Sequence, residues 1–268
     1  MSHDKWYKLD AMTQTLRFCS WNIQVGLKRA HVLELAARHP DFRDLDLLAL
    51  QEASVHANGD DASDIARALG GAYAAYQHVY HHLGSRAQAN ALIWNTTRVH
   101  MHSIAHHLLP QSKEVPLPRA ERMLLQRVKC QPRVNLIGEA VWRGISLRVC
   151  AAHLDVLGYR FRERQFRAAL DELRARPRAE LTLLAGDFNT LRVGKRPTWA
   201  RLKRAAAEAG LDAISDEIAW TQAIRALRLK QKLDEIFLAS ARAYHARVWA
   251  LDVNGSDHLP IFAEITFQ

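Results

Sequence analysis

The chain has 268 residues, of which 49% are hydrophobic and 24% are charged. This balance is typical of a globular protein with a sizeable core, and it excludes a chain that is mainly disordered or fibrous. Lys and Arg outnumber Asp and Glu by 37 to 28, so the net charge is +9 and an anionic partner is plausible.

Apolar runs of strand length recur along the chain, and helical patterns lie between some of them. We predict strands at 16–21, 45–50, 89–94, 123–128, 145–151, 181–185, 233–238 and 261–267, and helices at 31–38, 61–69, 161–174 and 198–209. Strands grouped with intervening helices indicate a layered α/β or α+β fold. No Gly/Ser-rich linker divides the chain, so we predict an N-terminal extension at 1–14 and a single domain at 15–268.

Polar residues cluster where several of the predicted strands end or begin. They are Asn22, Glu52, His153, Asp155, Asp187, Asn189 and the triplet Ser256-Asp257-His258. A single carboxylate after a strand usually caps a helix or a turn. Caps do not readily explain why carboxylates, amides and imidazoles recur at several strand ends. Carboxylate and amide oxygens are hard ligands, which suit Mg²⁺.

The motifs around these residues resemble one known family. They are Trp21-Asn22-Ile23, Leu50-Gln51-Glu52, Ala152-His153-Leu154, Gly186-Asp187-Phe188-Asn189, Leu233-Asp234-Glu235-Ile236-Phe237 and Ser256-Asp257-His258-Leu259-Pro260. In type and order they are similar to the motifs of the endonuclease/exonuclease/phosphatase superfamily, the DNase I-like metal-dependent phosphoesterases. Gly-Asp-Phe-Asn followed late by Ser-Asp-His-Leu-Pro is the specific part. Two further matches to positions often seen in the family are less diagnostic. They are Arg164-Gln165 and Arg122, which stands at the head of a predicted strand.

The resemblance implies a fold, a reaction and a metal ion. The fold is an α/β (α+β) four-layer α/β/β/α sandwich of two mixed β-sheets flanked by helices. The reaction is hydrolysis of a phosphate ester by in-line attack of water, with Mg²⁺ as the cofactor and Mn²⁺ as a substitute. A divalent cation neutralises the anionic phosphate and stabilises the leaving oxygen, which explains the residue types. Glu52 would be the leading metal ligand with Asn22 beside it, and Asp257 would bind a second ion or orient a neighbour.

The resemblance also assigns catalytic roles. Asp187 would orient or deprotonate the attacking water, and Asn189 would hold that water or a phosphate oxygen. His153 and His258 would donate hydrogen bonds to the phosphate, and Asp234 would pair with His258 and favour its protonated form. Which of Asp187 and His258 is the general base stays open at this stage.

Charge placement favours nucleic acid as the substrate. Residues 160–204 contain 13 Lys and Arg against 5 Asp and Glu, and they bracket Gly186 to Asn189. Arg192, Lys195 and Arg196 follow that motif directly, so we predict that they and Arg122 bind substrate phosphates. The alternative for helix 161–174 is an ordinary solvated face.

Two alternatives to a nuclease remain. His153 in its Ala-His-Leu context, together with Gln24, resembles the DNase I, sphingomyelinase, inositol-phosphatase and deadenylase branches more than the apurinic-endonuclease branch. A phospholipid or phosphoinositide phosphoesterase of the same fold is therefore the first alternative. A non-catalytic nucleic-acid-binding module is the second, although such a module has no need for the full set of acidic and imidazole residues.

The sequence also indicates where the protein works. The three cysteines Cys19, Cys130 and Cys150 show no CxxC spacing, which fits a reducing compartment. We see no secretory signal and no run of 18 apolar residues. We therefore expect a cytoplasmic monomer whose partner is an anionic phosphate ester, with no integral membrane association.

Overall fold

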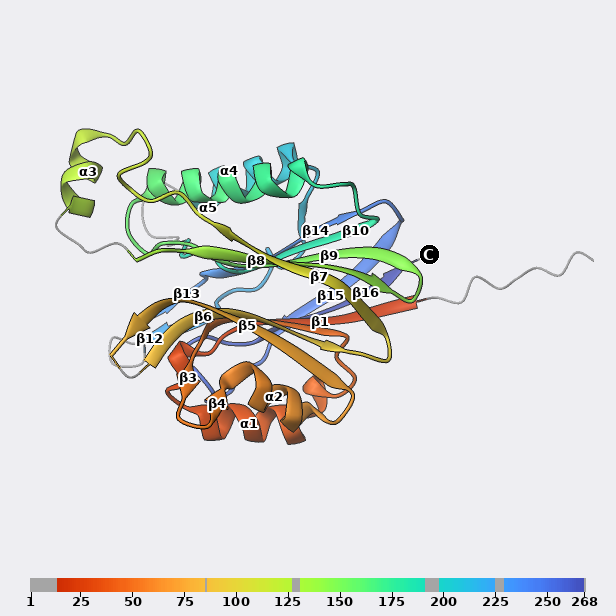
Figure 1. The fold of residues 1–268 in the computed structure, drawn as a ribbon. Helices are drawn as coiled ribbons and strands as arrows, with labels where there is room; N and C mark the ends of the chain where they lie inside the picture. The colour runs from red at the N-terminus through yellow and green to blue at the C-terminus, as the bar shows by residue number, and fades with distance from the viewer. Residues whose placement is uncertain (1–13, 85, 127–130, 191–197, 225–228, 268) are drawn as a thin grey trace, which may run out of the picture.

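The computed structural model describes residues 14–84, 86–126, 131–190, 198–224 and 229–267. Two six-stranded mixed sheets face each other at its centre (Figure 1). The first sheet has the order β15 (Tyr244–Ala250), β16 (Ile261–Phe267), β1 (Gln14–Asn22), β2 (Leu47–Ala53), β6 (Arg86–Asn95), β5 (Tyr73–Leu83). The second has the order β11 (Asp212–Ala213), β14 (Asp234–Ser240), β10 (Leu181–Asp187), β9 (Ile145–His153), β8 (Val134–Trp142), β7 (Val99–Leu108).

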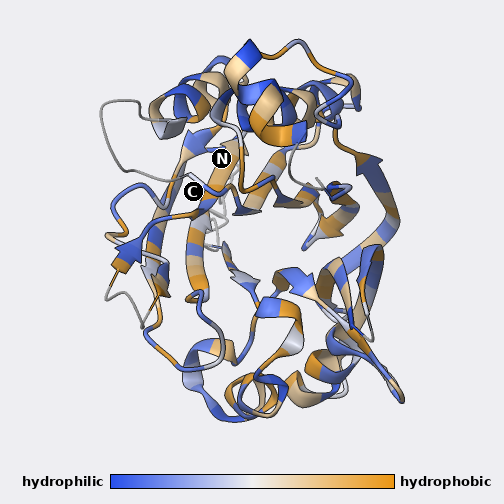
Figure 2. Cartoon of the chain, turned by 90° about the vertical axis from the view of Figure 1, so that its left-hand side faces the viewer, coloured by the Kyte–Doolittle hydropathy of each residue, from blue (hydrophilic) through white to orange (hydrophobic). Residues whose placement is uncertain are grey.

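Helices cover the outer face of each sheet. Helices α1 (Arg29–Arg38) and α2 (Asp61–Leu69) lie on the first sheet, and α4 (Tyr159–Ala175) and α5 (Thr198–Glu208) lie on the second (Figure 1). The helices carry alternating hydrophobic and hydrophilic bands, as helices that bury one face should (Figure 2). The predicted four-layer α/β/β/α sandwich is confirmed. None of the described helices is long and apolar enough to span a bilayer.

Shorter elements complete the fold. They are the 3₁₀ turns η1 (Gln24–Gly26) and η2 (Pro40–Phe42), the helix α3 (Arg119–Gln126), and two hairpins, β3 (Val55–His56) with β4 (Gly59–Asp60) and β12 (Gln222–Ile224) with β13 (Leu229–Gln231).

The central strands read as continuous apolar runs because both of their faces are buried. In β1, Leu16 and Phe18 pack between the two sheets, whereas Cys19 and Trp21 pack on the side of α1 and α2. Strands covered on both sides need apolar residues at every position, and strand length then identifies them in the sequence. This is why the strands that carry the site were predictable.

Strand register brings the polar strand ends together. β1 pairs in parallel with β2, so Asn22 lies opposite Gln51 and next to the Glu52 that follows. β10 pairs in parallel with β9 and antiparallel with β14, so Asp187 is flanked by His153 and Asp234. Because the two sheets face each other, these two sets meet at one end of the sandwich.

One sequence prediction of an element is wrong. Residues 123–126 lie in the helix α3, not in a strand. Of the apolar residues Met123, Leu124 and Leu125, only Leu125 is buried, and it packs with Leu117 and Phe161. Three consecutive apolar residues look alike in a buried strand and in a helix that buries one side, so local sequence did not separate the two.

Gly186 is required by the close packing of β10 against β9. Its φ is +147°, and a Cβ at this position would lie 1.8 Å from the carbonyl oxygen of Ala152. We expect Gly186→Ala to destabilise the fold by about 3–5 kcal/mol, because backbone strain adds to the overlap. Gly71→Ala is the matched control, since its Cβ would meet nothing within 4 Å. Urea unfolding measures both variants, and equal midpoints would contradict the expectation.

Candidate active site

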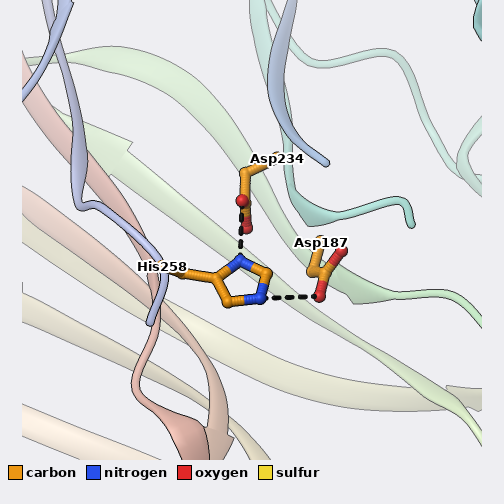
Figure 3. A group of neighbouring side chains, drawn as sticks. All are labelled: Asp187, Asp234 and His258. Carbon is orange, nitrogen blue, oxygen red and sulfur yellow. Dashed lines mark hydrogen bonds and ion pairs between the residues drawn. The ribbon is translucent and has the colours of Figure 1, made fainter. Parts of the chain in front are cut away.

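His258 lies between two aspartates at the meeting point of the sheets (Figure 3). Its Nδ1 is 2.8 Å from Oδ2 of Asp234, and its Nε2 is 3.8 Å from Oδ2 of Asp187. Asp234 begins β14 and Asp187 ends β10, whereas His258 comes from the segment before β16. All three side chains are almost fully buried. The pairing of Asp234 with His258 that the family resemblance implied is present.

The charges of these three groups depend on one another. Burial alone lowers the pKa of His258, but the Asp234 and Asp187 carboxylates outweigh it and raise the pKa to about 10. Burial raises the pKa of Asp187 to about 7, with Asp234 and Glu52 adding to the effect and His258 opposing it. The two carboxylates thus favour the cationic, hydrogen-bond-donating form of His258, and the pKa of Asp187 lies close to neutrality.

His153 has the opposite environment. It is buried, and the Arg133 guanidinium lies 3.0 Å from its Nδ1 while the Tyr80 hydroxyl lies 3.1 Å from the same atom. Burial first, and then the positive charges of Arg133 and His258, lower its pKa well below the usual value. His153 is therefore neutral. The same Arg133 nitrogen also lies 3.2 Å from Nε2. Nε2 faces Oδ2 of Asp187 at 3.6 Å and Oε1 of Glu52 at 3.8 Å, and these two acceptors favour the ring proton on Nε2.

Glu52 lies opposite this group on the first sheet. Its φ is +52°, an uncommon value for a residue other than glycine and one found repeatedly at functional sites. Oε1 accepts a hydrogen bond of 3.2 Å from Gln88 and lies 3.8 Å from Nε2 of His153. Burial raises the pKa of the Glu52 carboxyl, with Arg133 opposing this effect. The side chain nevertheless remains 20% exposed, so it is accessible to a ligand.

Asn22 and Asn189 link the aspartate to the two sheets. The Asn22 amide donates to Oδ2 of Asp187 at 3.0 Å, and the backbone N–H of Asn189 donates to Oδ1 at 2.9 Å. The Asn189 side chain donates to the carbonyl of Leu154 at 3.0 Å, and its φ is +51°. Both oxygens of Asp187 are thus held in place, which fixes the carboxylate relative to His258.

The residues present fit a divalent cation. Glu52, Asp187 and Asp234 face one another, burial raises the pKa of the first two, and Oδ1 of Asp234 is buried without a hydrogen-bond partner among the described residues. This excess of negative charge suits a cation with oxygen ligands. Donor atoms of Asp187, Asp234 and His258 lie within 4.8 Å of one another. However, a protonated His258 cannot coordinate a metal, and of the three carboxylates Glu52 is the accessible one.

Other predicted residues lie in different positions. Asp257 is half-buried, and its Oδ2 accepts from Gln222 at 3.1 Å, so its role with a second ion stays a prediction. Arg122 lies in α3 and not at the head of a strand, and it donates to the carbonyl of Leu117. The structure does not bring Arg122 to the catalytic side chains. Arg192, Lys195 and Arg196 lie outside the described residues.

Helix α4 carries Arg164 and Gln165, which lie in different environments. Gln165 is buried and accepts from the N–H of Asp155 at 2.9 Å, but its neighbour Arg164 is exposed. The buried arginine is Arg162, which donates to the carbonyls of Asp155 and Val156. Arg162 with Gln165, and not Arg164, therefore holds the segment that follows His153.

Three residues of the site were missed in the sequence. Tyr80 and Arg133 contact His153, and the side-chain amide of Gln222 lies 2.9 Å from Nε2 of His258. Arg133 stands directly before β8, and a correct placement of that strand would have identified it. Tyr80 and Gln222 lie in β5 and β12, where no local pattern distinguishes them.

Comparison with known proteins identifies the family. The model of the endonuclease/exonuclease/phosphatase family matches residues 19–258. The chain belongs to this family. It is therefore a phosphoesterase, and the endonuclease/exonuclease/phosphatase family typically uses a divalent metal. A comparison with curated protein sequences finds no significant match.

Solved structures share the endonuclease/exonuclease/phosphatase fold at low sequence identity. The human Nocturnin catalytic domain with bound sulfate is 20% identical, with 95% of each chain covered and a TM-score of 0.67. Danio rerio TDP2 complexed with a single-strand DNA product is 16% identical, covering 94% of this chain and 99% of that one, with a TM-score of 0.66. A mannosyl-6-phosphatase of Bacteroides thetaiotaomicron is 14% identical, with 93% and 99% covered and a TM-score of 0.67.

Proposed function

We propose that the protein is a Mg²⁺-dependent phosphodiesterase that hydrolyses DNA or RNA. The observation that carries the proposal is the arrangement of a neutral-pH base and a cationic donor, Asp187 and His258, 3.8 Å apart and opposite the accessible carboxylate of Glu52. Glu52 and Asn22 would hold the ion, which supplies positive charge to the phosphate and the leaving oxygen. Mn²⁺ has the same preference for oxygen ligands and would substitute.

The side chains divide the remaining work. Asp187 accepts a proton from the attacking water, because its pKa of about 7 leaves much of it ionised at neutral pH. His258 donates to a phosphate oxygen and stays protonated through its contact with Asp234. Neutral His153 donates from Nε2 to the phosphate, and Asn189, whose backbone N–H donates to Asp187, orients that carboxylate towards the attacking water. We therefore propose Asp187, and not His258, as the general base.

Two features support nucleic acid over other phosphate esters. The chain is basic, and TDP2, which shares the fold, is complexed with a single-strand DNA product in its own structure. Arg133, buried against the catalytic His153, would counter the charge of any phosphate ester at the site and does not separate these substrates. The mannosyl-6-phosphatase shares the fold equally well, so the assay must include sugar phosphates.

A substrate panel tests the proposal. The protein is incubated with Mg²⁺ and, separately, with plasmid, single-stranded DNA, RNA, sphingomyelin, inositol phosphates and mannose 6-phosphate, each with an EDTA control. We expect EDTA-sensitive cleavage of DNA or RNA. Turnover confined to the lipids would establish the phosphoesterase alternative, and turnover confined to the sugar or inositol phosphates would establish a phosphatase. Binding of nucleic acid without any turnover would leave a non-catalytic module.

Asp234→Asn tests the charge state of His258. Loss of the carboxylate removes the main contribution that raises the pKa of His258, so the imidazole is expected to lose its proton nearer its ordinary pKa of 6.5. Relative to the wild type at the same pH, the rate is expected to fall on the order of 10²-fold at pH 8, and this deficit is expected to narrow towards pH 6, because the cationic donor is lost as pH rises. The pH dependence of kcat/KM measures this, and Asp252→Asn is the exposed control. An unchanged alkaline limb would contradict the assignment.

A further inference from the structure

Four arginines gather on one side of α4, outside the catalytic group. Arg160, Arg164 and Arg167 recur at helical spacing and share one face of the helix. They line a cavity of about 420 Å³ with Arg201 of α5, Glu163, Pro116, Leu117 and Pro118. Among the described residues that line this cavity, Glu163 is the one carboxylate. We call Arg160, Arg164, Arg167 and Arg201 the arginine cluster.

Neighbouring side chains hold three of the four arginines in place. The guanidinium carbons of Arg160 and Arg201 lie over the Tyr159 ring, 5.8 and 5.9 Å from its centre. Glu163 accepts from Arg201 at 3.1 Å and from Arg167 at 3.4 Å. Arg164 is exposed and has no ion pair with the described residues. Guanidiniums held by stacking and by one shared carboxylate lose little further freedom when they bind an anion.

The helix that carries three of the clustered arginines also holds the segment after His153. The opposite face of the same helix contacts the segment after His153, because Gln165 accepts from the N–H of Asp155. The width of an α-helix with its side chains is about 10–12 Å, so the cluster stands about one helix diameter from that segment. This distance exceeds the reach of a sugar phosphate bound at His153 and Asp187. A polymer with a phosphate at every residue spans it.

We propose that the arginine cluster binds backbone phosphates of a nucleic-acid chain flanking the bond that is cleaved. The inference rests on the proposed nuclease function. It explains how the enzyme would prefer long substrates, because only a polymer would reach the arginine cluster from the cleaved bond. Arginine matches phosphate geometry with paired hydrogen bonds, and such contacts fix the position of a strand without reading its sequence. No aromatic side chain is among the described residues that line the cavity, so the cluster is suited to phosphates and not to base stacking.

Removing two members of the cluster tests the proposal. Arg164→Ala/Arg201→Ala is compared with Arg174→Ala/Arg178→Ala, a control with the same charge change near the other end of α4. Fluorescence anisotropy with a labelled single-stranded DNA oligonucleotide is measured in EDTA over a KCl series. We expect affinity to fall about tenfold, and the slope of log K against log [KCl] to become shallower by about 1.4, since each phosphate contact contributes about 0.7.

Glu163→Gln is expected to raise the affinity for nucleic acid, where the arginine substitutions lower it. The variant frees Arg167 and Arg201 from their shared carboxylate and removes a negative charge from the cavity. We expect oligonucleotide affinity to rise about threefold, with a steeper salt slope.

Steady-state kinetics gives a second measurement on the cluster variant. The value of kcat/KM for the oligonucleotide relative to bis(p-nitrophenyl) phosphate is expected to fall about tenfold in Arg164→Ala/Arg201→Ala and to be unchanged in Arg174→Ala/Arg178→Ala.

The outcomes separate this inference from the proposed function. If the wild-type protein cleaves the oligonucleotide and the cluster variant matches the control in slope and kinetic ratio, the inference is overturned and the nuclease function stands. If the wild-type protein neither binds nor cleaves nucleic acid, both are overturned. Co-sedimentation with phosphatidylserine vesicles is measured in parallel. A loss confined to vesicle binding in the cluster variant would replace the nucleic-acid strand by an anionic membrane surface.

Discussion

Asp187→Asn is expected to lower kcat by about 10⁴-fold, with the protein still folded. The side chain is buried, its Oδ2 accepts from Asn22 and its Oδ1 from the N–H of Asn189. An asparagine keeps the size of the group but cannot accept a proton from water. Single-turnover hydrolysis of an oligonucleotide measures the loss. Asp171→Asn, on the exposed side of α4, is the control and is expected to match the wild type.

The same variant has a consequence for stability that does not depend on the substrate. Burial raises the pKa of Asp187 from 3.8 to about 7 in the folded protein. A carboxyl whose pKa is raised by folding contributes stability at low pH, and this contribution is lost as pH rises from about 4 to about 7. The unfolding free energy of the wild type is therefore expected to decline relative to Asp187→Asn over that range. Parallel urea curves at pH 5 and pH 8 with an identical difference would show that Asp187 is not perturbed.

Much of the site was predictable because its residues follow or precede buried strands in specific motifs. Gly186 to Asn189 and Ser256 to Pro260 fix the chemistry at two strand ends, and β-sheet register brings them to Glu52. No local pattern marked Tyr80, because β5 is a half-exposed strand at the edge of its sheet, rich in histidine. Its contact with His153 joins residues 73 positions apart from two facing sheets, and such a contact requires the packed structure.

The charge pattern also could not be interpreted fully without the packed structure. The sequence shows an excess of basic residues at 160–204. It does not show which way each side chain points in the folded protein. In the structure Arg162 is buried behind the catalytic segment, Arg164 faces the cavity of the arginine cluster, and Arg174 lies near the other end of the helix. One helix thus contributes to packing, to a binding surface and to plain solvated surface. Helical period alone separates these faces only when the neighbouring layers are known.

Glu52→Gln is expected to abolish the response of the protein to Mg²⁺. Glu52 is the accessible member of a group of carboxylates whose charge is incompletely offset, and glutamine keeps its shape without its charge. We expect activity to fall on the order of 10³-fold. In the wild type, Mg²⁺ at about 100 times its Kd is expected to stabilise the fold by about 2.7 kcal/mol and to raise Tm by about 5–10 °C. In Glu52→Gln this shift is expected to vanish.

In EDTA, Glu52→Gln is expected to be more stable than the wild type. Burial raises the pKa of Glu52, so its ionised form costs stability at neutral pH unless a cation is bound. Glu52→Gln removes that cost and is expected to melt at a higher temperature than the wild type in EDTA at pH 8. Glu34→Gln, on the exposed side of α1, is the control and keeps the Mg²⁺ shift. Differential scanning calorimetry with and without Mg²⁺ measures all three proteins. A full Mg²⁺ shift in Glu52→Gln would place the ion on other residues, with the buried group of Asp187 and Asp234 as the first to test.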